Sequence, residues 1–177
     1  KLAESEESFS PKAKTDKLII DLRGNPGGYL HAAVEMASWF LPSGKVIVTE
    51  DYGENKDSEI FRSKGYDVFK GKLKLVILID GGSASASEIV AGALQDHGIA
   101  KVVGDKSFGK GSVQELIKVT TDTRLKITVA KWLTPNGNSI SEKGLTPDFM
   151  VKYTKEDAIA KKDPQLNKAV DLLLNWK

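Results

Sequence analysis

Cysteine is absent from the 177 residues, which excludes both disulfide bonds and thiol chemistry. Histidine occurs only twice, and no group of His, Asp or Glu shows metal-ligand spacing, so neither a metal nor another cofactor is expected. No apolar run approaches the ~20 residues that a membrane helix needs. The formal net charge of +2 gives no basic excess to attract nucleic acid. The whole sequence is 40% hydrophobic and 28% charged, which is the composition of an ordinary globular domain.

The apolar residues predict an α/β fold that begins after a polar tail. Residues 1–16 are mostly polar or charged, so we expect a disordered tail or truncated linker, followed by one domain at 17–177. Short, nearly continuous apolar runs at 18–22 and 75–80 predict strands that are buried on both faces. A strand, a helix and a strand in this order predict a right-handed parallel crossover.

The remaining segments complete this α/β pattern. In chain order they predict helices at 29–41 and 85–95, solvent-facing strands with long turns at 46–74, strands at 101–103, 113–119 and 125–133, and an amphipathic closing helix after Pro164. The two segments at 113–119 and 125–133 alternate in polarity, so we expect them to pair with each other. The result is a mixed sheet with flanking helices.

A glycine- and serine-rich segment, Gly-Gly-Ser-Ala-Ser-Ala-Ser-Glu at 81–88, connects a predicted strand to a predicted helix. A hydroxyl at a helix start lies near free N–H groups and the positive end of the helix dipole, which suits Ser85 to attack a carbonyl. Ser85 and Glu88 also match a capping box, which explains both residues without chemistry. Ser83 and Ser87 are further candidates, but only Ser85 has the glutamate in capping register.

Lys110 lies between two glycines, 25 residues after Ser85. It is a candidate general base, and because a lysine accepts a proton only when neutral, we expect its amine to be buried away from water. Gln114 could orient that amine through a hydrogen bond. Two alternatives stay open: an exposed turn lysine, and a phosphate-binding loop in which Gly111 would replace the required Ser or Thr.

The histidines are weaker candidates for the base. His97 lies twelve residues after Ser85 on the same predicted helix, about 18 Å away, and cannot reach the hydroxyl. His31 follows a glycine loop and stays open as an alternative base, although a surface histidine explains it equally well. The Gly-x-Ser-x-Gly pattern of the α/β-hydrolases is missing around Ser85.

Four motifs together resemble the C-terminal processing, or tail-specific, serine peptidases. They are Leu-Ile-Ile-Asp-Leu-Arg-Gly-Asn-Pro-Gly-Gly at 18–28, Gly-Ser-Ala-Ser-Ala-Ser-Glu at 82–88, Gly-Asp-Lys-Ser-Phe-Gly-Lys-Gly-Ser-Val-Gln at 104–114, and Thr-Pro-Asn-Gly-Asn-Ser-Ile-Ser-Glu-Lys-Gly-Leu-Thr-Pro-Asp at 134–148. The resemblance implies a crotonase- or Clp-protease-like core of strand-strand-helix units. It also implies the roles of six residues: Ser85 as nucleophile, Lys110 as base, Gln114 orienting the base, Glu88 as accessory group, and an oxyanion hole at the N–H of Ala86 with that of either Gly27 or Gly28.

The same resemblance implies a serine endopeptidase that cleaves proteins near their C-termini through an acyl-enzyme. Its partners would be a substrate with an apolar C-terminal tail, a PDZ domain that captures this tail and is absent from this sequence, and further copies in a homo-oligomer. It also implies an extracytoplasmic location. A bacterial periplasm or cell envelope, with a membrane anchor in some members, is favoured over the thylakoid lumen.

Two alternatives from other classes share this expected fold. A noncatalytic binding module, like related domains in retinoid-binding proteins, would not need Ser85, Lys110 and Gln114. A crotonase-like acyl-CoA enzyme would use the oxyanion loops for a thioester, but it explains neither Lys110 nor Gln114.

Overall fold

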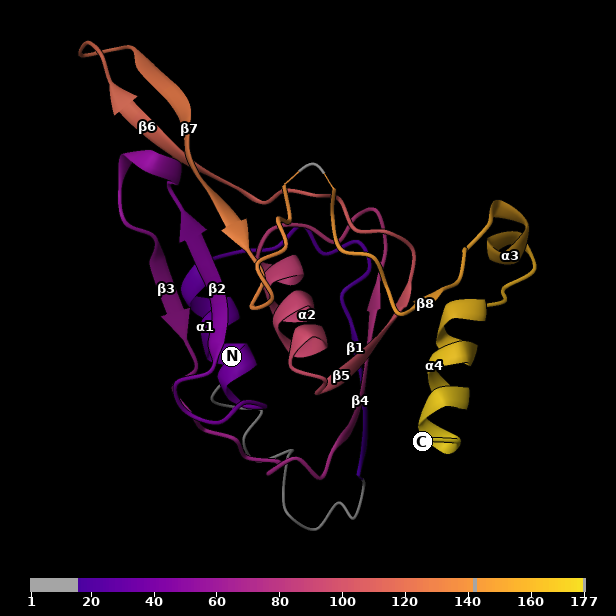
Figure 1. Cartoon of the computed structure of the whole chain (residues 1–177). Coiled ribbons are helices and arrows are strands. Elements are labelled where there is room, and N and C mark those ends of the chain that lie inside the picture. The colour runs from indigo at the N-terminus through magenta and orange to yellow at the C-terminus, as the bar shows by residue number, and fades with distance from the viewer. Residues whose placement is uncertain (1–15, 142, 177) are drawn as a thin grey trace.

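The computed structural model describes residues 16–141 and 143–176 and arranges them in two four-stranded sheets with helices (Figure 1). One sheet is parallel, with strand order β1-β4-β5-β8, and the other is antiparallel, with order β3-β2-β7-β6. The elements are β1 (Lys17–Asp21), α1 (Leu30–Ser38), β2 (Val46–Asp51), η2 (Gly53–Asn55), β3 (Glu59–Arg62), β4 (Lys74–Ile79), α2 (Ala86–Asp96), β5 (Ala100–Gly104), β6 (Ser112–Lys118), β7 (Arg124–Leu133), β8 (Phe149–Met150), α3 (Lys155–Ile159) and α4 (Pro164–Leu174). The predicted α/β class is confirmed, but parallel and antiparallel strands form separate sheets.

Strand β4 lies inside the parallel sheet and divides the core in two. Its residues 75–79 are fully buried, as predicted. Leu75, Ile77 and Ile79 join the main core with α1 and α2, whereas Val76 and Leu78 join a second cluster with α4. This alternation follows from the two-residue period of a strand, and it explains why the sequence shows a continuous apolar run.

Strand β1 shows where the burial prediction was wrong. It pairs only with β4 and is an edge of the parallel sheet, so residues 17–20 are partly buried and Asp21 is exposed. The predicted tail lies outside the described residues except for Asp16. Its backbone oxygen accepts a hydrogen bond from Lys74 N at 2.7 Å, and its carboxylate pairs with Lys74 Nζ at 2.9 Å.

The predicted crossover is present as β4, α2 and β5, with β4 and β5 parallel and adjacent in the sheet. Helix α2 lies between the two sheets (Figure 1), and its residues 86–94 are all buried. Ile47 and Val48 of β2 pack in the same core, so β2 is more buried than the sequence predicted. This packing places the start of α2 beside the loops that follow β1 and β5.

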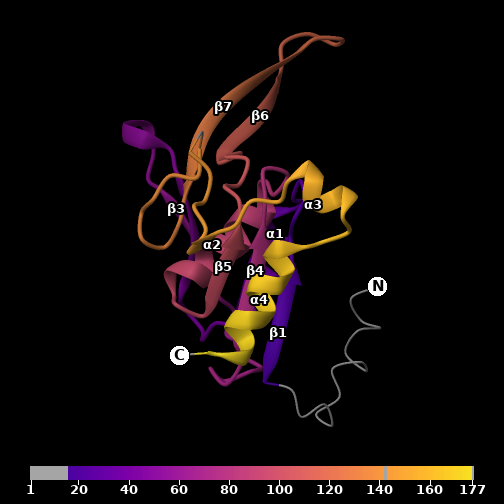
Figure 2. The same ribbon diagram turned by 90° about the vertical axis from the view of Figure 1, so that its right-hand side faces the viewer.

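Strands β6 and β7 form the predicted antiparallel pair, which projects beyond the body of the molecule (Figure 1). Near its tip Leu116 and Leu125 are exposed because no other layer covers the hairpin there. Helix α4 covers the face of the parallel sheet that α1 and α2 leave open (Figure 2). None of the described helices is long and apolar enough to cross a membrane.

Candidate active site

Ser85 occupies a strained turn between β4 and α2. It precedes the first residue of α2 and has φ 57° and ψ −120°, a conformation that residues with a Cβ rarely adopt. Such backbone geometry costs on the order of 1–3 kcal/mol and persists where the surroundings enforce it, often at functional sites. The strained backbone of Ser85 therefore indicates that the position of this residue is functionally important.

The hydrogen bonds of the neighbouring serines distinguish them from Ser85. Ser83 Oγ donates to Leu22 O at 2.8 Å and accepts from Asp80 N at 2.9 Å. Ser87 Oγ donates to Asn25 O at 3.1 Å. Both hydroxyls thus attach the turn to the loop after β1. This supports Ser85 as the candidate nucleophile.

The glycine loop, residues 23–28, packs directly on the serine turn, the segment that carries Ser85 between β4 and α2. Asn25 O accepts a hydrogen bond from Ala84 N at 3.0 Å. A Cβ added at Gly27 would stand 2.5 Å from Ala84 O and 2.8 Å from both Ala86 N and Ser85 Cβ. Only glycine permits this approach, and Gly27 also has φ +96°. The glycine loop and the start of α2 therefore form one continuous backbone surface.

Two N–H groups on this surface lack acceptors. Within residues 16–141 and 143–176, neither Ala86 N nor Gly28 N donates a hydrogen bond, whereas Gly27 N donates to Asn25 Oδ1 at 3.0 Å. Free N–H groups near a nucleophile are what an oxyanion hole requires. Of the two glycines left open for the oxyanion hole, only Gly28 has an N–H without an acceptor among the described residues.

Replacing Gly27 with alanine should destabilise the domain by about 2 kcal/mol, because the new methyl group would meet backbone atoms of the serine turn and adopt a strained φ. Chemical denaturation of Gly27→Ala would measure this loss. Gly24→Ala is the matched control, since Gly24 also has positive φ, +63°, but has nothing within 4 Å of an added Cβ. Equal stability of the two variants would contradict the close packing.

Glu88 connects the serine turn to the loop that carries Lys110. Its side chain is fully buried. Oε2 accepts from Ser85 N at 2.8 Å and Lys110 N at 3.0 Å, while Oε1 accepts from Ser107 Oγ at 2.6 Å and Gly109 N at 2.7 Å. Four donors on one carboxylate offset the cost of burying its charge. The capping box predicted from the sequence is thus also a bridge between two candidate catalytic segments.

Ser107 and Gly111 attach the lysine loop, residues 104–111, to the segment after β7. Ser107 Oγ accepts from Leu145 N at 2.6 Å, and a Cβ added at Gly111 would collide with Ser141 N and Ile140. The segment at 134–148 therefore supports the lysine loop from outside. Sequence reasoning missed Ser107 and Asn25, since their polar side chains look like ordinary loop residues before the contacts are known.

The side chain of Lys110 is exposed, so the expected burial of its amine is wrong for this structure. Lys110 lies just before β6, where the chain leaves the body for the projecting hairpin, and little surrounds it. Gln114 is exposed on β6 as well, at a register shift between Val113 and Gln114. Neither side chain hydrogen-bonds to another described residue, although the Lys110 backbone is held by Glu88. The structure brings together Ser85, Ala86, Glu88 and the glycine loop, but not the predicted lysine–glutamine pair.

The two histidines are engaged elsewhere. His97 follows α2, and its Nε2 lies 2.7 Å from Val46 O. His31 is exposed on α1, with its ring edge-to-face against Phe61 at 6.4 Å between centroids. In the part of the chain that the structure describes, no group of three or more potential ligands could hold a metal ion.

Comparisons with known proteins agree with the motifs. Residues 2–151 match the family model described as Peptidase family S41. A carboxy-terminal-processing protease of Bartonella bacilliformis is 46% identical over 144 residues, which are 80% of this chain and 33% of that protein. A probable CtpA-like serine protease of Staphylococcus aureus (strain N315) is 42% identical over 144 residues, or 81% of this chain and 29% of that protein. The chain thus spans a third or less of either relative.

A solved structure titled photosystem II D1 C-terminal processing protease has a TM-score of 0.73 and 31% identity, over 85% of this chain and 38% of that chain. The mutant of CPAF named s499a has a TM-score of 0.75 at 16% identity, which shows a shared fold. The fold and the matches together define a domain of the peptidase class. Within that class, the chain belongs to peptidase family S41. These matches do not favour the binding-module or acyl-CoA alternatives.

Proposed function

We propose that this domain is the catalytic part of a serine endopeptidase that cleaves proteins near their C-termini, with Ser85 as nucleophile and Lys110 as general base. The strained Ser85 turn carries this proposal, because Ser85 stands beside the free N–H of Ala86 while Ser83 and Ser87 are occupied by structural hydrogen bonds. The protease names of the Bartonella bacilliformis and Staphylococcus aureus relatives support a proteolytic reaction.

In the proposed reaction, neutral Lys110 takes the proton of Ser85 Oγ as this oxygen bonds to the substrate carbonyl carbon. The carbonyl oxygen becomes an oxyanion, which the N–H groups of Ala86 and Gly28 stabilise. Protonated Lys110 then gives its proton to the leaving amine as the C–N bond breaks. Water hydrolyses the resulting acyl ester, which releases the product and restores Ser85.

Lys110 has to approach Ser85 for this chemistry. The bonds from Gly109 N and Lys110 N to Glu88 hold the backbone of Lys110 close to the serine turn, so its long side chain can supply the movement. A substrate lying over the exposed lysine would exclude water from the space between its amine and Ser85. Gln114 could then orient the amine. We therefore assign alignment of the dyad to substrate binding.

The full-length enzyme would have a further domain, an oligomeric state and a cellular location that this domain alone does not determine. A PDZ domain outside this sequence would capture an apolar C-terminal tail, and the full-length enzyme would form a homo-oligomer. It would work outside the cytoplasm, in a bacterial periplasm or cell envelope. The protease names of the relatives, and the much greater length of those relatives, support additional domains in a full-length form.

Labelling with a fluorophosphonate, which reacts with activated serines, tests the nucleophile in the full-length enzyme. We expect the wild type to be labelled and Ser85→Ala to lose labelling completely, since the other turn hydroxyls are held by backbone groups. Ser87→Ala is the matched control and should retain labelling. Labelling of Ser85→Ala at the wild-type rate would show that another residue is the nucleophile, and an unlabelled wild type would contradict the proposed peptidase.

A further inference from the structure

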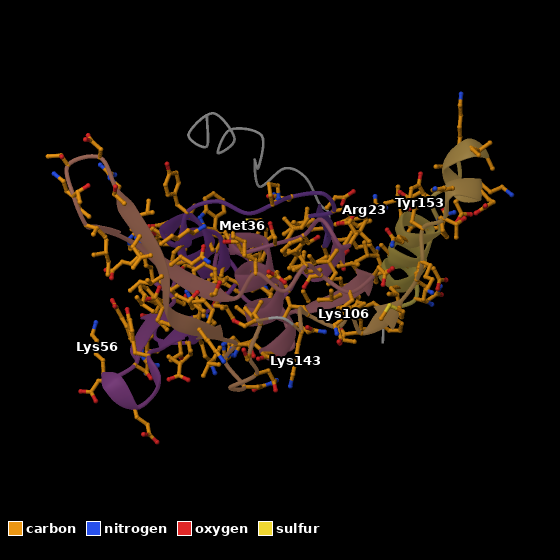
Figure 3. All side chains as sticks on the ribbon, turned by 90° about the horizontal axis from the view of Figure 1, so that it is seen from above. Arg23, Met36, Lys56, Lys106, Lys143 and Tyr153 are labelled. Atoms are coloured by element: carbon orange, nitrogen blue, oxygen red, sulfur yellow. The ribbon has the colours of Figure 1, made fainter. Side chains whose placement is uncertain are left out.

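Arg23, the first residue of the glycine loop, is held by the C-terminal helix. Its Nη1 donates to Gln165 Oε1 at 3.0 Å and pairs with Asp163 Oδ2 at 2.9 Å. Its Nε and Nη2 bind Asp21 at 2.9 and 2.6 Å. The Arg23 side chain is only 19% exposed, so these charge-assisted bonds are partly shielded from water. Figure 3 shows Arg23 between the sheet and α4, near Tyr153.

The partners of Arg23 at the start of α4, Asp163 and Gln165, are themselves fixed by hydrogen bonds. Asp163 caps α4 by accepting from Leu166 N at 2.9 Å. Gln165 is 1% exposed, and its Nε2 donates to Val151 O at 2.7 Å, just after β8. Along the helix, Ala169 and Leu173 pack on Val76 and Leu78 of β4. Arg23 is therefore tied to a helix that is anchored on the sheet.

Arg23 is also directly followed by the rest of the glycine loop, which includes the candidate oxyanion-hole glycines. The next residue, Gly24, donates through its N–H to Asp80 Oδ1 at 2.8 Å. Asn25 then accepts the bonds from Ala84 N and Ser87 Oγ that join the loop to the serine turn. A shift of Arg23 would thus move the loop that presents the Gly27 and Gly28 backbone to Ser85.

We propose that Asp163 and Gln165 are positioning residues for the Ser85 site: through Arg23, the docked helix α4 holds the glycine loop in the geometry that oxyanion stabilisation needs. This inference rests on the proposed peptidase function. Residues 152–177, which include α4, lie beyond the segment that matches the family model. The contact therefore joins the matched segment to residues outside it.

The charge of the contact can be removed without removing the helix cap. Asp163→Asn keeps an oxygen for Leu166 N, because asparagine caps helices as well as aspartate does, but it weakens the bond to Arg23. In the full-length enzyme we expect about a tenfold lower kcat with KM within about twofold, since a slightly displaced donor mainly weakens transition-state binding. Labelling of Ser85 by fluorophosphonate should slow by a similar factor.

Asp171→Asn is the matched control, because Asp171 is on the exposed side of the same helix and pairs with Lys168 rather than Arg23. It should keep the wild-type kcat. A double-mutant cycle with Arg23→Met adds a second test: if both residues act through one contact, Asp163→Asn should have little further effect in the Arg23→Met background.

A kcat for Asp163→Asn equal to that of Asp171→Asn would overturn the positioning role, as would fully additive losses in the cycle. A lower melting temperature with unchanged kcat would show that the contact is only structural. These results differ from a failure of the proposed function, in which the wild-type enzyme itself would leave Ser85 unlabelled.

Discussion

Replacing Lys110 with methionine in the full-length enzyme is expected to lower the rate of Ser85 acylation by about a thousandfold, because the reaction loses its general base and acid. The fold should be unaffected. The Lys110 side chain is exposed and makes no hydrogen bond to the described residues, so the unfolding free energy should change by less than about 0.5 kcal/mol. Single-turnover acylation by a peptide ester, together with urea unfolding, measures both quantities.

Lys106→Met is the matched control for this experiment. Lys106 is an exposed lysine of the same loop, four residues earlier, and no catalytic role is assigned to it. It should acylate at the wild-type rate. Undiminished acylation by Lys110→Met would remove lysine from the mechanism, and equal losses in the two variants would point to the charge of the loop rather than to one base.

Replacing Glu88 with glutamine should have the largest effect on stability, about 3–5 kcal/mol. The carboxylate accepts two bonds at each oxygen, and an amide can accept at only one of them. Whichever way it is oriented, the NH₂ group faces a backbone N–H donor, at Ser85 and Lys110 or at Gly109. We also expect slower labelling of Ser85, because the serine turn and the lysine loop lose their shared anchor.

Urea unfolding of Glu88→Gln measures the first effect and fluorophosphonate labelling the second. Glu115→Gln offers a comparison, since Glu115 is exposed on β6 and should change the unfolding free energy by less than about 0.5 kcal/mol. If Glu88→Gln were as stable as Glu115→Gln, the four-donor bridge would not be a stabilising feature of the molecule in solution.

Sequence periodicity predicted the elements that form the centre of the fold, but not their surroundings. The runs in β1 and β4 look alike in the sequence, yet β4 lies between two strands while β1 lies at the edge. An apolar run shows that a strand is compatible with burial. The position of the strand in the sheet determines whether it is buried. Pairing order depends on contacts between distant segments, which a single pattern does not contain.

The candidate site likewise has features that the local sequence predicts and features that it does not. The cap position of Ser85 and the register of Glu88 are local, and the sequence identified both. The exposure of Lys110 depends on where the β6–β7 hairpin leaves the body. The loss of Gly27 as a free donor depends on the Asn25 side chain, which accepts from Gly27 N. Arg23 and Asp163 are 140 positions apart, so no local pattern could have joined them.

Helix α4 has a consequence for how this domain can be delimited. The segment that matches the family model ends at residue 151, but the side chains of Val76, Leu78 and Val103 face Ala169 and Leu173. A protein trimmed at that point would present a bare aliphatic surface on the back of its parallel sheet. The segment that matches the family model therefore ends before the packed domain does, and an excised version that keeps this surface covered has to extend through Leu174.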